Sequence, residues 1–272
     1  MTDYATAETH DLFRRLFTAK SAHLVAETHA FFHPDRVFYA DATLGWSWPS
    51  SQSLYDVWDE YMPNWPAEAL SYPTRVIGDA TSAIVFMTDT PELFGGEIRA
   101  IAPIDFADDG RIVRWIDYWD GRNFGADKVN AMRTPSAQFP DLYADLPVRR
   151  PTRVDDVVAH LHADPVETLF SPDAVVEDLT LRTTVRGRAA IGRYLGRAAA
   201  SLPYGPSAQV RHIVGGDLGG GYEWQSTTEA ARGVTALELG ANGSIDRLTS
   251  VWDGSLVTGG ALRDMAAYAL DL

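Results

Sequence analysis

The chain has 272 residues, enough for two domains of ordinary size, and its 46% hydrophobic and 22% charged residues are typical of a globular protein. The formal net charge of −14 argues against binding of nucleic acid or anionic membranes, because both would be repelled. The absence of cysteine excludes disulfides, thiolate metal sites and a cysteine nucleophile. No apolar run is long enough to span a membrane and the first residues lack the pattern of a signal peptide, so we expect a cytoplasmic protein.

The first half of the chain predicts helices followed by strands. Apolar residues at helical spacing predict helices within 7–32, a strand-like stretch over 37–41 follows, and a serine-rich cap begins a helix over 51–64. Four strand-like runs then occupy 72–78, 82–89, 97–107 and 112–119, with short turns between them. Helices followed by a meander of strands predict an α+β fold, in which a curved, mostly antiparallel sheet packs against N-terminal helices.

Two stretches of the first half recur in the second half. Arg247-Leu-Thr-Ser-Val-Trp-Asp-Gly254 repeats the pattern of Arg114-Trp-Ile-Asp-Tyr-Trp-Asp-Gly121. Ser171-Pro-Asp-Ala-Val-Val-Glu177 repeats that of His33-Pro-Asp-Arg-Val-Phe-Tyr39, so that Glu177 takes the place of Tyr39. The spacing between the two stretches is nearly the same in each half, and we interpret the chain as two diverged copies of one domain.

The copies define the expected domain organisation. Residues 1–133 form the first domain, the proline-rich segment 134–152 is the linker, and residues 153–272 form the second domain. When the two copies are aligned without gaps, Leu179 falls at the position of Asp41, and Ser250 falls at that of Asp117. We therefore expect a degenerate second domain that serves mainly as a built-in partner in an intramolecular pseudo-dimer, and association of two whole chains into a homodimer stays open.

The run from 112 to 119 carries the first candidate site residue. Side chains alternate between the faces of a strand, so Trp115, Asp117 and Trp119 share one face. A carboxylate between two tryptophans is costly to bury without a partner. The spacing allows either a salt bridge with a nearby arginine or an acid whose raised pKa suits proton transfer.

Three further residues could join Asp117 in one dry cavity. Tyr39 and Asp41 share a face of the first short strand, and Asp89 ends the run over 82–89 on the face that carries Met87. Close carboxylates cannot all ionise, so one would stay protonated as an acid while another acts as a base. Tyr39 could donate a hydrogen bond to a developing oxyanion.

Most of the tryptophans lie in the first copy and predict an apolar or π-rich ligand. The residues that we expect to bind substrate are Trp46, Trp48, Trp58, Trp115, Trp119 and Met87. The sequence contains no nucleophile elbow, Walker loop, dinucleotide fingerprint, or zinc or calcium spacing, so we expect neither a cofactor nor a metal.

Two motifs carry a family resemblance. Pro34-Asp-Arg-Val-Phe-Tyr-Ala-Asp41 after helices, and a meander that ends in Gly110-Arg-Ile-Val-Arg-Trp-Ile-Asp-Tyr-Trp-Asp120, resemble the nuclear transport factor 2-like superfamily. Its enzymes include SnoaL-like polyketide cyclases, ketosteroid isomerases and limonene epoxide hydrolases. The resemblance implies two fused cone-shaped domains.

The last strand most resembles that of limonene epoxide hydrolases, which use two aspartates with an arginine between them, and a tyrosine and an asparagine that hold the attacking water. The aspartates match Asp117 and Asp89, the tyrosine and asparagine fall at Tyr39 and Asp41, and the arginine falls at Met87 and is missing. The acid pair is also similar to that of polyether epoxide cyclases, some of which are two fused copies of this domain.

The resemblance implies a cofactor-free enzyme that opens an epoxide on a small hydrophobic metabolite, by hydrolysis or by intramolecular cyclisation, in secondary metabolism. Asp117 and Asp41 would be its acid and base, with Asp89 and Tyr39 assisting. A SnoaL-like cyclase, a ketosteroid isomerase-like isomerase and a non-catalytic ligand-binding or scaffold protein are the alternatives, because this fold hosts many activities.

Overall fold

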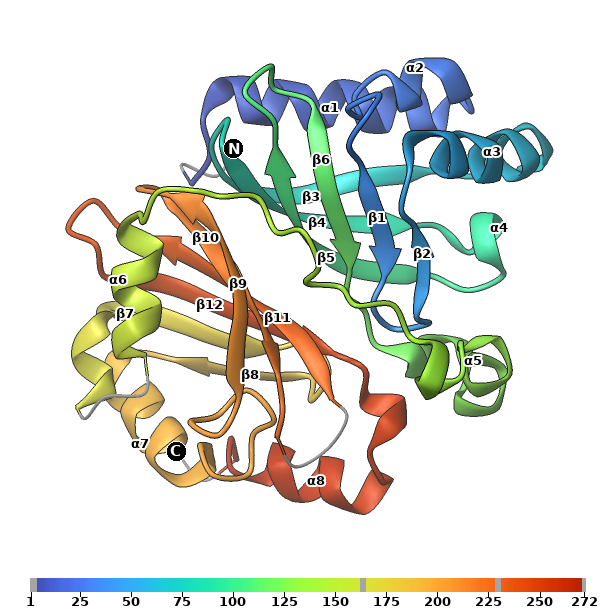
Figure 1. The fold of residues 1–272 in the computed structure, drawn as a ribbon. Coiled ribbons are helices and arrows are strands. Elements are labelled where there is room, and N and C mark those ends of the chain that lie inside the picture. Colours follow the sequence, from blue (N-terminus) through green and yellow to red (C-terminus); the bar gives the residue numbers. More distant parts are fainter. Residues whose placement is uncertain (1–3, 162–164, 228–230, 271–272) are drawn as a thin grey trace.

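The computed structural model describes residues 4–161, 165–227 and 231–270, and it consists of two six-stranded sheets with helices on their outer faces (Figure 1). The α+β fold predicted from the order of helices and strands is confirmed. Each half of the chain forms one sheet, as the repeated motifs predict.

The first domain begins with helices and ends with a sheet and short helices. Its helices are α1 (Ala7–Ser21), α2 (Val25–His29), α3 (Ser51–Tyr61), α4 (Pro91–Phe94) and α5 (Ala126–Met132). Its strands are β1 (Phe38–Asp41), β2 (Trp46–Trp48), β3 (Ser71–Gly78), β4 (Ser82–Asp89), β5 (Ile98–Phe106) and β6 (Ile112–Asp117).

The second domain has a similar series of elements. Its helices are α6 (Arg153–His160), α7 (Arg188–Ala198) and α8 (Gly259–Ala267). Its strands are β7 (Phe170–Asp178), β8 (Thr183–Arg186), β9 (Gln209–Gly216), β10 (Gly219–Gln225), β11 (Arg232–Leu239) and β12 (Ile245–Trp252).

Strand order is the same in both sheets. The first sheet runs β2-β1-β6-β5-β4-β3 and the second runs β8-β7-β12-β11-β10-β9. In each sheet the first strand lies parallel to the last one, as β1 does to β6 and β7 to β12, while the other neighbours are antiparallel. This order brings the end of β1 beside the end of β6, where three of the candidate site residues lie.

Local sequence signals explain where these elements begin and end. The Thr6 side chain caps α1, and the Ser50 and Ser53 side chains form a capping box at the start of α3. Helix α3 ends at Tyr61, earlier than predicted, and Pro63 lies in the short 3₁₀ turn that follows it. Gly110, at φ +80°, makes the predicted tight turn between β5 and β6.

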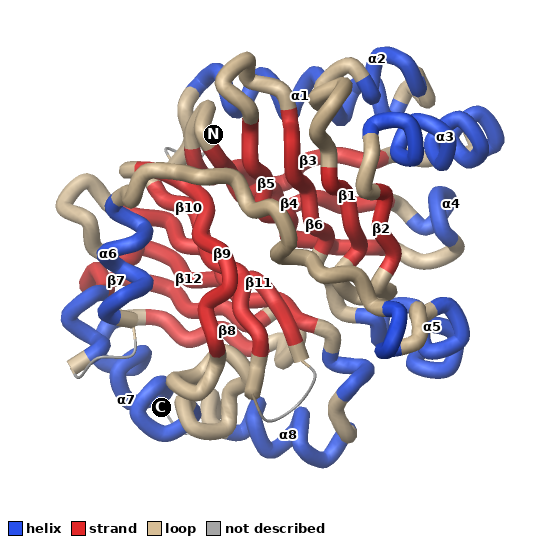
Figure 2. Tube along the Cα trace, viewed as in Figure 1, coloured by secondary structure: helices blue, strands red, loops and turns tan. Residues whose placement is uncertain are grey.

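Each sheet buries one face under helices and the other against the second sheet. Helix α1 packs Phe13 and Phe17 onto the first sheet. On the opposite face, isoleucines and alanines of the first sheet share one buried cluster with Val214, Val234 and Val251 of the second. The linker crosses from α5 to α6 along the boundary between the sheets (Figure 2). The two sheets therefore pack back to back.

The repeated Trp-Asp-Gly motif lies at this domain contact. Asp253 accepts a hydrogen bond from the Gly121 backbone N–H at 3.1 Å and forms an ion pair with Arg133 at 2.6 Å. A Cβ atom on Gly121 would lie 2.8 Å from Oδ1 of Asp253, so the close approach of the domains requires glycine there. The motif is thus explained by packing between the copies.

Ionisable side chains are also buried between the sheets. Arg114 lies 2.6 Å from Oε2 of Glu223, and His212 lies 2.8 Å from Oδ2 of Asp105. Arg114 also donates a hydrogen bond to the carbonyl of Leu142 in the linker. Buried charges are tolerated when they are paired, and here each pair joins the two domains.

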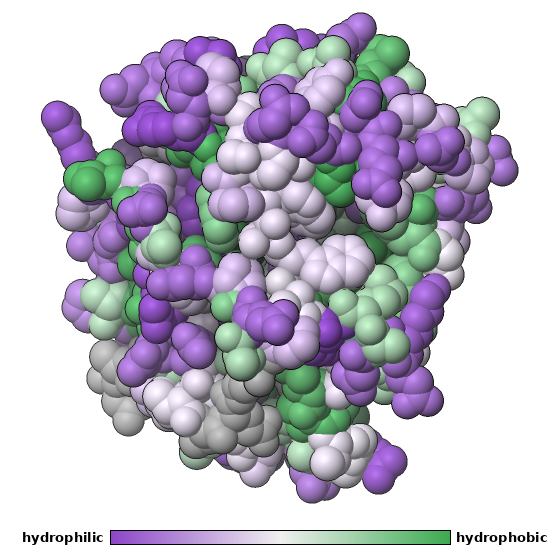
Figure 3. Space-filling model, turned by 45° about the vertical axis from the view of Figure 1, so that its right-hand side comes forward, coloured by the Kyte–Doolittle hydropathy of each residue, from purple (hydrophilic) through white to green (hydrophobic). Residues whose placement is uncertain are grey.

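The exterior is mixed in hydropathy. On the face shown in Figure 3, hydrophilic side chains surround a central area of intermediate hydropathy, and hydrophobic side chains form small groups. Within the part of the chain that the structure describes, every helix is too short or too polar to cross a membrane.

Candidate active site

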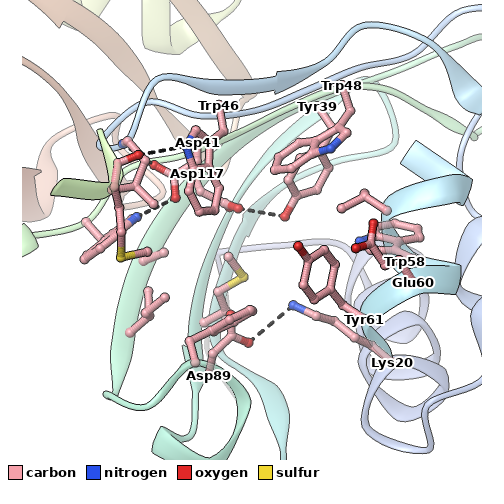
Figure 4. A pocket seen from close by; sticks show the side chains of 18 of the residues that line it. Lys20, Tyr39, Asp41, Trp46, Trp48, Trp58, Glu60, Tyr61, Asp89 and Asp117 are labelled. Carbon is pink, nitrogen blue, oxygen red and sulfur yellow. Dashed lines mark hydrogen bonds and ion pairs between the residues drawn. The ribbon is translucent and has the colours of Figure 1, made fainter. Parts of the chain in front are cut away.

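A cavity of about 700 Å³ opens between the helices and the covered face of the first sheet (Figure 4). Most of its wall is apolar and aromatic. It is lined by Lys20, Tyr39, Asp41, Leu44, Trp46, Trp48, Ser53, Asp56, Val57, Trp58, Glu60, Tyr61, Trp65, Met87, Asp89, Phe94, Ile98, Ala100, Asp117, Trp119, Phe124 and Met132. The four residues expected to take part in catalysis all line this one cavity.

Asp117, at the end of β6, has hydrogen bonds to both carboxyl oxygens. The Tyr39 hydroxyl donates to Oδ2 at 2.7 Å, and the indole N–H of Trp115 donates to Oδ1 at 2.6 Å. Burial raises the pKa of Asp117 to about 7, although the hydrogen bond from Tyr39 works in the opposite direction, and the nearby Asp41 carboxylate raises the pKa further. Near neutral pH, Asp117 can therefore hold or release a proton.

Asp41, at the end of β1, holds the turn that follows it. Its Oδ1 accepts hydrogen bonds from the backbone N–H groups of Thr43 at 2.8 Å and Leu44 at 2.7 Å. Its Oδ2 accepts one from the indole of Trp119 at 2.8 Å. Burial raises the pKa of Asp41 to about 6 against the effect of these donors. Three donors already engage this carboxylate.

Asp89 forms an ion pair with Lys20 at the opposite end of the cavity (Figure 4). The Lys20 ammonium lies 3.3 Å from Oδ1 of Asp89, and the Ser71 hydroxyl donates a hydrogen bond to the same oxygen. Lys20 was not among the predicted site residues. Its signal in the sequence is its place on the apolar face of α1, three residues after Phe17, where a lysine is exceptional unless paired.

The structure places all but one of the expected substrate-binding residues on the cavity wall. Trp46, Trp48, Trp58, Trp119 and Met87 line the cavity. Trp115 does not, because its ring is buried behind the wall. There it packs against Phe13, Phe17 and Phe32 of the helical layer and stacks on Tyr39. Strand alternation gave the correct face for Trp115 but did not show how deeply it is buried.

The strand register places the second-domain counterparts of Tyr39 and Asp41 one position away from those that the ungapped alignment of the two copies gave. Asp41 pairs in register with Asp117, and Asp178 pairs with Ser250 in the same way. Asp178 is therefore the counterpart of Asp41, and the assignment of Leu179 was wrong. The assignment of Glu177 to the position of Tyr39 was wrong for the same reason, because the stretch before the end of the strand is one residue shorter in the second copy.

Large side chains fill the corresponding space in the second domain. Trp224 stands where the first sheet has Met87, is fully buried, and packs against Tyr204 with ring centroids 5.7 Å apart. Ser250, in the place of Asp117, is bonded to the Thr235 hydroxyl at 2.8 Å. A cavity of about 250 Å³ lies nearby, between the loop after α7 and α8.

No model of a protein family matches the sequence, and no curated protein matches it. Solved structures similar to parts of the chain include a SnoaL-like protein of unknown function from Burkholderia thailandensis, with 13% identity over 44% of this chain and 99% of that chain, and a TM-score of 0.37. A Shewanella putrefaciens protein provisionally named a SnoaL-like polyketide cyclase has 14% identity over 47% of this chain and 88% of that chain, with a TM-score of 0.38. A Kribbella flavida protein provisionally named a ketosteroid isomerase has 21% identity over 54% and 93%, with a TM-score of 0.36. Each match spans about half of this chain.

Proposed function

We propose that the protein is a cofactor-free acid/base enzyme that acts on a small hydrophobic metabolite, and that its reaction is the opening of an epoxide by water or by an internal hydroxyl. The observation that carries this proposal is the position of Asp117 on the wall of an aromatic cavity, where burial raises its pKa to about 7. A carboxylic acid that is partly protonated near neutral pH is suited to proton transfer.

In this reaction the carboxyl group of Asp117 donates its proton to the epoxide oxygen as the carbon–oxygen bond breaks. The hydrogen bonds from Tyr39 and Trp115 then stabilise the carboxylate that forms. These donors are fixed before the reaction, so they need no reorganisation when the charge develops.

A second group must take the proton of the attacking water or hydroxyl. We assign this role to Asp89, because Lys20 and Ser71 both engage its Oδ1 and, among the described residues, no hydrogen bond to its Oδ2 is formed. Asp41 is the less suitable base, since both of its oxygens already accept hydrogen bonds that hold the turn. The acid and the base would then lie at opposite ends of one cavity.

The test is the variant Asp117→Asn, assayed for hydration or cyclisation products of apolar epoxides by mass spectrometry. We expect turnover to fall by about 10²- to 10⁴-fold, the usual contribution of a positioned acid. Circular dichroism should show an unchanged fold, because the amide nearly preserves the shape of the carboxyl group. Ser250→Ala, at the corresponding position of the second domain, is the matched control and should leave turnover unchanged. Near-normal turnover in Asp117→Asn would remove Asp117 from the mechanism.

An isomerisation next to a carbonyl group is a second candidate. It is favoured by the adjacency of Tyr39 and Asp117, since a protonated Asp117 can donate a hydrogen bond to an enolate oxygen beside the Tyr39 hydroxyl. Incorporation of solvent deuterium next to the carbonyl of apolar ketones would identify this reaction. Ligand binding without conversion of either substrate class, and unchanged in Asp117→Asn, would instead indicate a binding protein.

A further inference from the structure

We infer that the metabolite bound in this cavity is a hydrophobic cation, an apolar skeleton that carries a protonated amine or a quaternary ammonium group. This inference rests on the proposed function, because it names the substrate class of the same site. It follows from the arrangement of the aromatic rings and from the balance of charge on the cavity wall.

The aromatic rings meet at steep angles and bound the cavity from several directions. Trp46 and Trp48 have ring centroids 6.4 Å apart at 86°, Trp48 and Tyr39 are 5.7 Å apart at 67°, and Tyr39 and Trp58 are 6.0 Å apart at 82°. The faces of aromatic rings are negative, and tryptophan is the strongest partner for an organic cation. Rings on the wall of one cavity can present their faces to an ammonium group.

The charge on the wall also favours a cation. The described residues that line the cavity include no arginine and no histidine, and their single lysine, Lys20, is paired with Asp89. The acids among them are Asp41, Asp56, Glu60, Asp89 and Asp117. A phosphate or carboxylate ligand would lose its hydration against these acids without gaining an unpaired positive partner.

One acid is available to meet a ligand. Glu60 lies beside Trp58 on α3 at the edge of the cavity (Figure 4). Its carboxylate forms neither a hydrogen bond nor an ion pair with any residue that the structure describes, whereas the neighbouring Asp56 accepts a hydrogen bond from Gln52 at 2.7 Å. An ammonium group held by the tryptophans would therefore find an unpaired carboxylate at the same side of the cavity.

The experiment compares probes of one shape and different charge. Phenyltrimethylammonium and tert-butylbenzene are isosteric, and benzoate supplies a negative charge. Binding to the full chain is measured at constant pH by quenching of tryptophan fluorescence and by calorimetry, in the native protein and in Asp117→Asn. We expect the cation to bind about tenfold more tightly than the neutral probe, and benzoate to bind more weakly than either.

Two variants separate the contribution of the aromatic rings to cation binding from that of the Glu60 carboxylate. Trp48→Leu should remove most of the preference for the cation, and Glu60→Gln should reduce it about two- to fivefold while leaving the neutral probe unaffected. Asp59→Asn, an acid on the same helix that does not line the cavity, is the control and should change neither affinity. Equal or tighter binding of the neutral probe or of benzoate, or no saturable binding of the cation at millimolar concentration, would overturn the inference.

These measurements distinguish failure of the cation site from failure of the proposed enzyme activity. A preference for the cation that persists in Asp117→Asn, together with no turnover of epoxides or ketones by the native protein, would support the cation site and refute the enzyme. Turnover that depends on Asp117 without any preference for the cation would do the reverse.

Discussion

Asp41 and Asp178 hold the same turn in the two domains. The Oδ1 atom of Asp178 accepts a hydrogen bond from the N–H of Leu181 at 2.8 Å, as that of Asp41 does from Leu44, and each Oδ2 accepts one from the indole of a tryptophan. The second domain has Ser250 where the first has Asp117 and yet keeps this arrangement. The hydrogen bonds to the turn are therefore sufficient to explain why an aspartate stands at position 41, and no role of Asp41 in proton transfer is required.

This equivalence predicts similar costs for Asp41→Ala and Asp178→Ala. Each leaves buried N–H groups without an acceptor, so each should lower the free energy of unfolding by about 1–3 kcal/mol, measured by urea denaturation. Asp41→Asn keeps an acceptor oxygen for the turn and should retain far more turnover than Asp117→Asn. If the two asparagine variants lose activity equally, Asp41 takes part in the reaction and its role is not only structural.

We expect the pH dependence of the reaction to follow the titration of the Asp117 carboxyl group. Because its pKa is raised to about 7 and the protonated form is the proton donor, kcat/KM should fall as the pH rises through about 7. The hydrogen bond from Trp115 stabilises the ionised form, so Trp115→Phe should move this fall to higher pH. A profile that is the same in both proteins would assign the titration to another group.

Individual strands and helices could be predicted well, because their periodicity is a local property of the sequence. The runs at 82–89 and 112–119 were confirmed nearly to the residue, and the turn at Gly110 was confirmed. The convergence of Asp117 with Tyr39 follows from the parallel pairing of β1 with β6, which no local pattern in the sequence contains.

What could not be predicted depends on contacts between elements. Alternation along β6 placed Trp115 on the correct face, but the phenylalanines of α1 and of the segment after α2 decide that it lies behind the cavity wall. Lys20 was missed because its partner is far away in the sequence, on β4. The ungapped comparison was wrong at Leu179, because only the strand register shows that the copies differ by one residue there.

The pairing of helix α1 with strand β4 can be tested through Lys20. Lys20→Met leaves the Asp89 carboxylate in the cavity without its counter-ion, which should lower the free energy of unfolding by about 3–5 kcal/mol. If Asp89 is the base, turnover should fall as well, because its carboxylate loses the ammonium group that holds it in place.

The double variant Lys20→Met/Asp89→Asn provides the control in a thermodynamic cycle. Removal of both charges should recover most of the lost stability but none of the turnover. A double variant as unstable as Lys20→Met would show that the contact of the Lys20 ammonium with the Phe17 ring, 5.8 Å from its centroid, matters more than the ion pair.

At the scale of the whole molecule, the first domain depends on the second for the back of its sheet. The strands that carry the candidate site on one face bury Ile84, Ile101 and Ile116 against the second sheet on the other. The space matching the cavity is filled by Trp224 in the second domain. We propose that the second copy is retained as the partner that a homodimer would otherwise supply.

This dependence predicts one cooperative unfolding transition for both domains. Tryptophans report mainly on the first domain, whereas circular dichroism reports on both, so the two signals should change at the same urea concentration. Arg114→Met leaves Glu223 buried without its partner and should lower the free energy of unfolding by about 3–5 kcal/mol, although Arg114 does not line the cavity. Arg114→Met/Glu223→Met should recover most of this loss.

The same variant tests what couples the domains, since Arg114 lies on the strand that also carries Asp117. Separation of the fluorescence and circular dichroism transitions in Arg114→Met would mean that the charge pair joins the domains. A single, shifted transition would mean that the apolar contact between the sheets is sufficient to couple them.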